Sequence, residues 1–281
     1  MDIVASPRPR SRLLRRHVAL PSDHGSWVFL LSPLAIGLVA GGRLTAATPF
    51  VVLGAVAVFL LRQPTSLLVK IFSGRRPRDD WPAAAFWTAL YGLAGLLSAA
   101  ALIAMGFAYL LYLFVPALPV YAYHLFLVSR RAERRQMGVE VAGSGILALA
   151  APAALWAGLG RADPMGWWLW GLVWLQSAAS ILYAYLRLEQ RAWAATPPPS
   201  ECLRRGWLAL TATTFSLLAV GAVAAAGVVP AALMLPYLVQ WLESLWGTLR
   251  PAVGQRPVRI GMRQLIVSSL FTILFMVTWR L

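Results

Sequence analysis

The residues most able to carry chemistry stand near the start of the chain, in the run Leu20–Gly42. Asp23 and His24 come directly before an apolar segment, and Trp27 follows about one turn later. An oxygen of Asp23 can accept from the unpaired amides of a first helical turn. His24, held by Asp23, can donate a proton or contact a headgroup. We therefore assign Asp23 and His24 as candidate catalytic residues and Trp27, a typical membrane-boundary ring, as a candidate ligand contact.

The composition shows what kind of element must position these residues. Of the 281 residues, 59% are hydrophobic and 12% charged, and the mean hydropathy is +0.68. These values exclude an ordinary soluble globule and indicate a polytopic membrane protein. The net charge of +15 does not indicate nucleic-acid binding, because its arginines lie in short segments between apolar runs. Cys202 is the only cysteine, which excludes an intramolecular disulfide and a cysteine metal cluster.

Apolar runs of near the ~20 residues that cross a bilayer recur through the chain. They predict an all-α protein with about nine transmembrane helices. The predicted helices span residues 24–42, 46–62, 82–103, 105–128, 137–159, 163–187, 206–227, 229–247 and 263–280. Residues 1–20 are predicted to be a basic cytoplasmic arm, and residues 21–281 a single transmembrane domain.

The basic residues alternate between the connections in agreement with this map. Five precede the first predicted helix, five follow the second, and four each follow the fourth, sixth and eighth. Only Arg43, Arg161 and Arg280 fall on the other side. Because cytoplasmic loops are enriched in Lys and Arg, we expect a cytoplasmic N-terminus and an external C-terminus. Such loops predict a multi-pass membrane protein.

Two smaller patterns bear on packing. The fourth and eighth predicted helices both begin with Pro and Ala followed by Tyr, at Pro116–Tyr121 and Pro230–Tyr237, which predicts a repeat of four helices with a ninth appended. The alternative is that Pro and Tyr are simply common at helix starts. Gly37 and Gly41 have the small-xxx-small spacing that permits close approach of another helix.

The remaining ionisable residues give no metal site. His17, His24 and His124 are isolated, without ligand spacing, and most of the ten acids lie close to the predicted cytoplasmic boundary. We therefore expect no metal ion and no cofactor.

The run His24-Gly25-Ser26-Trp27, followed by an apolar helix with Pro33 and Gly37, resembles the opening signature of the YwiC-like family of bacterial membrane proteins. That family is in turn similar to the UbiA-type intramembrane prenyltransferases. The resemblance implies nine helices around a cavity that opens toward the cytoplasm. It leaves the activity open.

The chain departs from the acidic motifs with which UbiA-type enzymes hold Mg²⁺ and a diphosphate. Arg62-Gln63 stands at the first motif position and Arg187-Leu188-Glu189-Gln190-Arg191 at the second. If the resemblance extends to the fold, Arg62, Arg187 and Arg191 converge at one cavity mouth. Guanidinium groups bind phosphate or carboxylate without a metal. Membrane topology alone would also place arginines on this side.

These observations predict a membrane protein that holds an anionic amphipathic lipid or isoprenoid. Its site residues would be Asp23, His24, Trp27, Arg62, Gln63, Arg187, Glu189 and Arg191. The alternatives are a UbiA-like prenyltransferase with degenerate motifs and a membrane assembly or transport subunit. Membrane lipids are the expected partners, nucleic acid is not, and the sequence names no protein partner.

Overall fold

A computed structural model describes residues 13–21, 25–130 and 136–281, and these residues form helices and connections without any β-strand. A short N-terminal helix, α1 (Arg16–Ala19), precedes the main bundle. The bundle consists of α2 (Ser26–Ala40), α3 (Thr48–Phe72), α4 (Trp81–Ala104), α5 (Phe114–Ser129), α6 (Met137–Ala148), α7 (Ala150–Leu159), α8 (Met165–Gln190), α10 (Trp207–Ala225), α11 (Met234–Leu249) and α12 (Pro257–Thr278). The short α9 (Pro199–Arg205) and the 3₁₀ turns η1 (Arg78–Asp80), η2 (Ala108–Leu113) and η3 (Ala231–Leu233) complete the described part.

The all-α class predicted from the sequence is confirmed. Seven helical segments among the described residues are long and apolar enough to cross a bilayer: Thr48–Phe72, Arg78–Ala104, Ala108–Ser129, Met137–Leu159, Met165–Gln190, Trp207–Ala225 and Pro257–Thr278. α2 and α11 have 15 and 16 residues. At ~1.5 Å per residue both are shorter than the ~30 Å hydrocarbon core. All nine predicted segments are thus helical, but seven, rather than nine, meet the length and composition of a span.

The second predicted helix ends too early. The sequence prediction ends it at residue 62, whereas α3 continues to Phe72 and carries Arg62 and Gln63 in its interior. Pro64 interrupts the backbone hydrogen bonding there, and the hydroxyl of Thr65 donates to the carbonyls of Leu61 and Arg62 in the same turn. Membrane helices tolerate an interior proline of this kind, and α3 continues through it.

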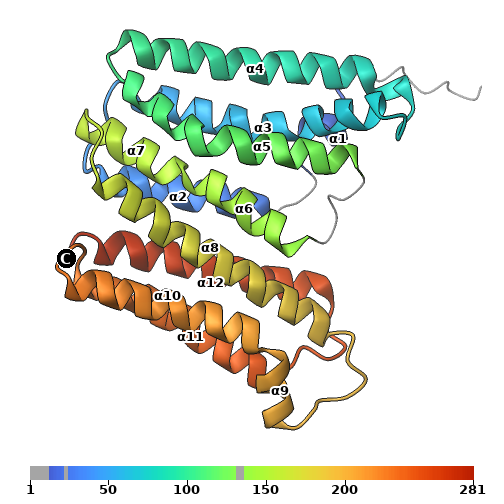
Figure 1. The fold of residues 1–281 in the computed structure, drawn as a ribbon, viewed down its shortest axis with the longest axis vertical. Helices are drawn as coiled ribbons and strands as arrows, with labels where there is room; N and C mark the ends of the chain where they lie inside the picture. Colours follow the sequence, from blue (N-terminus) through green and yellow to red (C-terminus); the bar gives the residue numbers. More distant parts are fainter. Residues whose placement is uncertain (1–12, 22–24, 131–135) are drawn as a thin grey trace, which may run out of the picture.

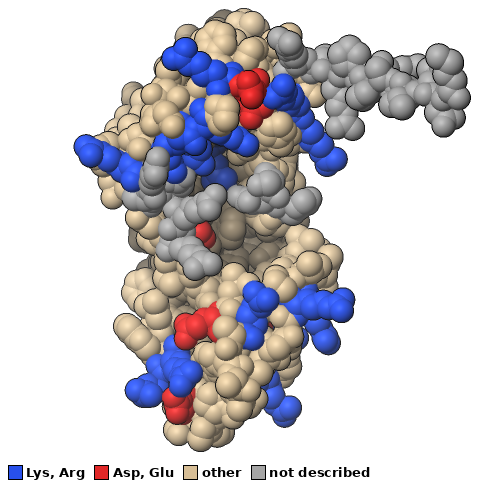
Figure 2. Space-filling model, turned by 90° about the vertical axis from the view of Figure 1, so that its right-hand side faces the viewer, with Lys and Arg blue, Asp and Glu red and all other residues tan. Residues whose placement is uncertain are grey.

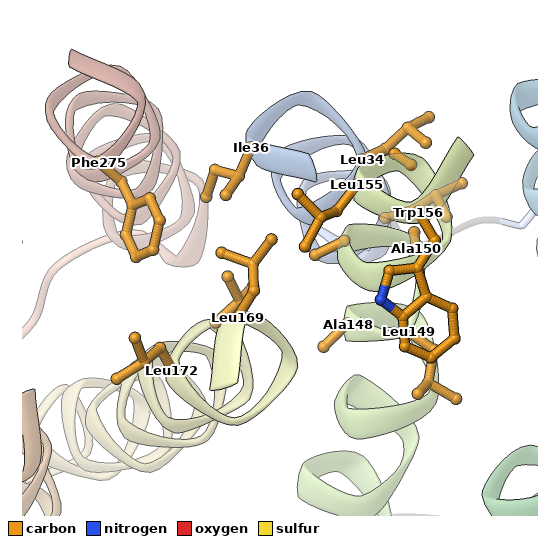
Figure 3. Close-up of a cluster of buried hydrophobic side chains, with 14 of the residues drawn as sticks. Leu34, Ile36, Ala148, Leu149, Ala150, Leu155, Trp156, Leu169, Leu172 and Phe275 are labelled. Atoms are coloured by element: carbon orange, nitrogen blue, oxygen red, sulfur yellow. The ribbon is translucent and has the colours of Figure 1, made fainter. Parts of the chain in front are cut away.

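The helices are arranged in three groups along the longest axis of the molecule (Figure 1). α3, α4 and α5 lie at one end, α8, α10, α11 and α12 at the other, and α2, α6 and α7 between them. The central core forms where α2 and α7 meet α8 and α12, around Ile36, Leu155, Leu169 and Phe275 (Figure 3). The middle group is therefore the packing junction of the bundle.

The two glycines on α2 serve the close approach that their spacing predicts. A Cβ added at Gly37 would overlap the backbone of Ala151 on α7. Gly41 lies against Gly158 of α7, and a Cβ added to either glycine would press on the backbone of the other. α7 is thus the packing partner that the sequence left unnamed.

Lys and Arg side chains gather at one end of the bundle, above and below a hollow (Figure 2). Residues 13–20, from the predicted arm, pack there against α3 and α4. Val18 is buried beside Leu67, Ala83 and Ala84. Arg15 donates to the Asp80 carboxylate over 2.5 Å. We call this end, where α3, α5 and α8 finish and α6 begins, the basic end.

Two hairpins at the opposite end share one geometry. After α4, the amides of Gly106 and Phe107 donate to the carbonyls of Ile103 and Leu102. After α10, Gly227 and Val228 bond in the same pattern to Ala224 and Val223, and both glycines have positive φ. This is the Schellman helix ending, for which glycine is the favoured residue. Each of these two helix endings is followed by a 3₁₀ turn and a proline-containing helix. This is expected if the two segments are counterparts in a repeat.

Candidate functional site

A cavity of about 790 Å³ opens between α2, α3, α5 and α6 at the basic end. Phe59, Arg62, Gln63, Ser66 and Lys70 line it from α3. Their spacing of three and four residues places them on one helical face, so the continuation of α3 past residue 62 builds one wall.

The facing wall follows the same helical rule. Val120, Tyr121, His124 and Val128 line the cavity from α5, and Val139, Glu140, Gly143 and Leu147 line it from α6. Gly25, Ser26 and Phe29 add the beginning of α2. The site is therefore assembled from segments more than a hundred residues apart.

Hydrogen bonds fix several of the polar side chains in this wall. Gln63 donates through Nε2 to the carbonyl of His17, 3.0 Å away, and so ties α3 to the N-terminal segment. The hydroxyls of Tyr121 and Thr65 lie 2.6 Å apart. Tyr185 on α8 donates to Oε1 of Glu140 over 2.7 Å. These contacts hold the lining in place without blocking the cavity.

The charges of the described lining favour an anion. Arg62 and Lys70 contribute two positive charges, while Glu140 contributes one negative charge. The two cations lie eight residues apart on α3, which is about 12 Å along the helix. A guanidinium can bind a phosphate or carboxylate through two parallel hydrogen bonds, and an ammonium adds a point charge. The geometry thus suits an anionic headgroup near the basic end.

An apolar pocket of about 160 Å³ lies beside this cavity, toward the opposite end. Val58, Phe59, Ile146 and Leu147 line both spaces. A polar cavity at the basic end and an apolar pocket farther along the bundle are therefore neighbours that share four wall residues.

The predicted site residues fall into three groups. Arg62 and Gln63 line the cavity. Trp27 packs edge-on against Phe59, with ring centroids 4.8 Å apart, and so lies behind a lining residue. Asp23 and His24 lie outside the described residues, and Gly25 and Ser26, which follow them in sequence, are part of the lining.

The expected convergence of Arg187 and Arg191 with Arg62 requires correction. Arg187 is 2% exposed on α8, away from the cavity lining, and its Nη1 donates to Gln190 Oε1, Gly247 O and Arg250 O. Arg191 follows α8 and donates to the carbonyl of Gln255 over 3.4 Å. Glu189 is exposed on the same helix. A buried guanidinium saturated by carbonyl acceptors acts as a structural tie between α8 and α11.

The predicted site does not include several polar lining residues, among them Lys70, Tyr121 and Glu140. The sequence prediction places Lys70 in a loop, because it ends the second helix at residue 62. Had the helix been continued through Pro64, the spacing Arg62, Ser66, Lys70 would have revealed one polar face. No comparable signal in the sequence links α5 and α6 to that face.

The Mg²⁺ site that the UbiA resemblance implies does not fit the residues present. Among the described lining residues, Glu140 supplies the one carboxylate, and its Oε1 already accepts from Tyr185. The part of the chain that the structure describes contains no group of three His, Cys, Asp or Glu side chains that could hold a metal ion. Mg²⁺ bridging a diphosphate needs several oxygen ligands, and Arg62 would oppose it.

The fold and cavity define an all-α polytopic membrane protein with an amphipathic internal space. Residues 20–155, about half of the chain, match the family model described as YwiC-like protein, which confirms the predicted resemblance over the region that contains the cavity. The chain is 28% identical over 160 residues to "Uncharacterized protein YwiC" of Bacillus subtilis (strain 168). This alignment covers 57% of the chain and spans 61% of the relative's length. No solved structure matches the chain.

Proposed function

We propose that this protein binds an anionic amphiphile in the membrane, with the headgroup beside Arg62 and Lys70 and the hydrocarbon tail among the apolar helices. The observation that carries the proposal is that the basic cavity and the apolar pocket are neighbours with four wall residues in common. A soluble anion would gain nothing from the apolar extension, and an uncharged lipid nothing from the two cations. An amphiphile uses both.

The cavity mouth is proposed to face the cytoplasm of a bacterial inner membrane. The loops at the basic end hold most of the arginines, while Arg43, Arg161 and Arg280 lie in connections or termini at the other end. This asymmetry is the usual mark of a cytoplasmic side. The ligand's headgroup would then enter from the inner leaflet.

A UbiA-like arrangement of the helices is proposed as the evolutionary background of this cavity. The nine helical segments, the matched Gly106 and Gly227 hairpins and the opening at the basic end support it. Because the acidic motifs are absent and Mg²⁺ is not accommodated, binding or metal-free chemistry on the ligand fits the site better than conventional prenyl transfer. Asp23 and His24, whose successors in sequence line the cavity, are the proposed catalytic pair if the ligand is chemically altered.

The test is native mass spectrometry with lipid extraction on the purified full-length chain, comparing wild type with Arg62→Met and Arg191→Met. Met keeps most of the apolar volume of Arg and removes its charge. We expect one class of anionic lipid on the wild type, and a loss of affinity of about ten- to a hundredfold in Arg62→Met, since a charge-assisted contact is worth ~1.5–3 kcal/mol. Arg191→Met is the matched control, because Arg191 belongs to the basic end but not to the lining.

Each outcome has one meaning. Retention of the same mixed bulk lipids by all three proteins would refute the binding site and leave the arginines as topology signals. Equal loss in Arg62→Met and Arg191→Met would show a general effect of charge rather than a site. If incubation converts the bound lipid to a product, His24→Asn should retain the lipid and abolish the product, whereas a carrier or assembly subunit gives no product.

A further inference from the structure

The apolar pocket is shaped for a hydrocarbon chain. Its described lining comes from α2, α3, α4, η2, α5, α6 and α7, and Ser98 provides its single hydroxyl. That hydroxyl donates to the carbonyl of Ala94 over 2.8 Å and is thus satisfied within α4. This described lining therefore suits an apolar group of a ligand.

The pocket is smaller than the headgroup cavity and lies farther along α3. Val51 lines the pocket and Arg62 lines the cavity on the same helix, eleven residues apart, which corresponds to about 16 Å. This is close to half of the ~30 Å hydrocarbon core. A volume of about 160 Å³ is comparable to cavities of ~150 Å³ that hold one benzene molecule. The pocket therefore has room for the end of one chain.

We propose that this pocket takes the distal end of one hydrocarbon chain of the ligand and that α4, at Gly95, sets the longest chain that is accepted. The inference rests on the proposed function, because Arg62 fixes the headgroup and thereby the point from which chain length is measured. Selection by length follows from a fixed head and a pocket of limited volume. Each methylene that the pocket buries contributes ~0.8 kcal/mol to binding, whereas a methylene that does not fit contributes nothing.

Gly95 is the position where the pocket can be shortened without disturbing the packing. It lines the pocket, and a Cβ built there meets no heavy atom within 4 Å. A leucine side chain at this position therefore enters open space rather than displacing a neighbour. Gly92, one turn earlier on α4, is equally open and does not line the pocket, so Gly92→Leu is a matched control.

The experiment measures binding of a series of alkyl phosphates, from decyl to octadecyl, to the delipidated full-length protein by native mass spectrometry. Wild type, Gly95→Leu, Gly92→Leu and Arg62→Met are compared. We expect Gly95→Leu to bind the longest chain that wild type accepts about tenfold more weakly, the effect of excluding roughly two methylenes. Its affinity for the shortest chains should be unchanged. Gly92→Leu should keep the wild-type profile.

The failure of this inference is distinguishable from the failure of the proposed function. If wild type binds the series and Arg62→Met weakens every chain length, but Gly95→Leu retains the wild-type length profile, the headgroup site stands and the chain-length role of Gly95 is refuted. If Arg62→Met binds like wild type, the proposed function itself fails. A uniform loss across all lengths in Gly95→Leu also contradicts a length-setting role.

Discussion

Two arginines at the basic end occupy similar places on long helices and have opposite surroundings. Arg62, on α3, lines a cavity of about 790 Å³ between α2, α3, α5 and α6. Arg187, on α8, is 2% exposed and bonded to Gly247 and Arg250 on α11 and after it. In the N-terminal half a cavity lies beside Arg62, whereas in the C-terminal half backbone carbonyls surround Arg187.

Arginines at the same end of a membrane protein can thus have different surroundings and different structural uses. In the C-terminal half, the polar groups close on one another. Arg263 forms two hydrogen bonds with the Glu243 carboxylate, and its guanidinium lies over the Trp246 ring at 3.8 Å. Tyr183 donates to the same carboxylate. A hydrogen-bonded network of this kind rigidifies helix packing, whereas in the N-terminal half Arg62 and Lys70 line a cavity.

The largest effect should come from exchanging each arginine for methionine. Arg187→Met removes the donors to Gln190 Oε1 and Arg250 O inside the packed region, and we expect a loss of about 2–4 kcal/mol in the free energy of unfolding. Arg62→Met, at a half-buried position in the cavity wall, should lower that free energy by less than Arg187→Met does, while weakening anion binding. Tryptophan fluorescence during denaturation in detergent measures the free energy of unfolding of both variants.

Equal loss of stability in the two variants would remove the distinction between the regions. Loss of ligand binding in a still-folded Arg187→Met protein would restore Arg187 as a ligand contact.

A smaller effect should separate the glycines of the two regions. At Gly247 on α11, an added Cβ would overlap the hydroxyl and ring of Tyr183, so Gly247→Ala should destabilise by about 1–3 kcal/mol. At Gly143 on α6, which lines the cavity, a Cβ meets nothing within 4 Å. Gly143→Ala should therefore be neutral or stabilise by up to ~1 kcal/mol through helix propensity. The same denaturation experiment checks both, and a destabilised Gly143→Ala would mean that the cavity wall is packed after all.

The sequence predicts the helices well because a bilayer imposes long apolar runs on them. It also predicts that Arg62 and Gln63 lie near a site. Its errors come from contacts that no local pattern records. The polar turn at Arg62, Gln63 and Pro64 is typical of a helix end, whereas α3 continues through it to Phe72.

The placement of Arg187 could not be predicted for a related reason. The count of basic residues in loops gives a side of the membrane, but not a neighbour. Its acceptors Gly247 and Arg250 lie some sixty residues away, and the small size of Gly247 is what admits Tyr183 beside them. A glycine on an apolar helix has many causes, so this one carried no signal by itself.

The smallest effect should distinguish the two carboxylates. Glu243, with a side chain 11% exposed, is held by both Arg263 and Tyr183, so Glu243→Gln should cost about 1 kcal/mol of stability through the lost ionic contacts. In Glu140→Gln an amide oxygen can still accept from Tyr185, and stability should change by less than ~0.5 kcal/mol. Removal of a negative charge from the lining should instead strengthen binding of hexadecyl phosphate, measured by native mass spectrometry. Because like charges repel across the cavity, unchanged or weaker binding in Glu140→Gln would indicate that the headgroup does not lie between α3 and α6.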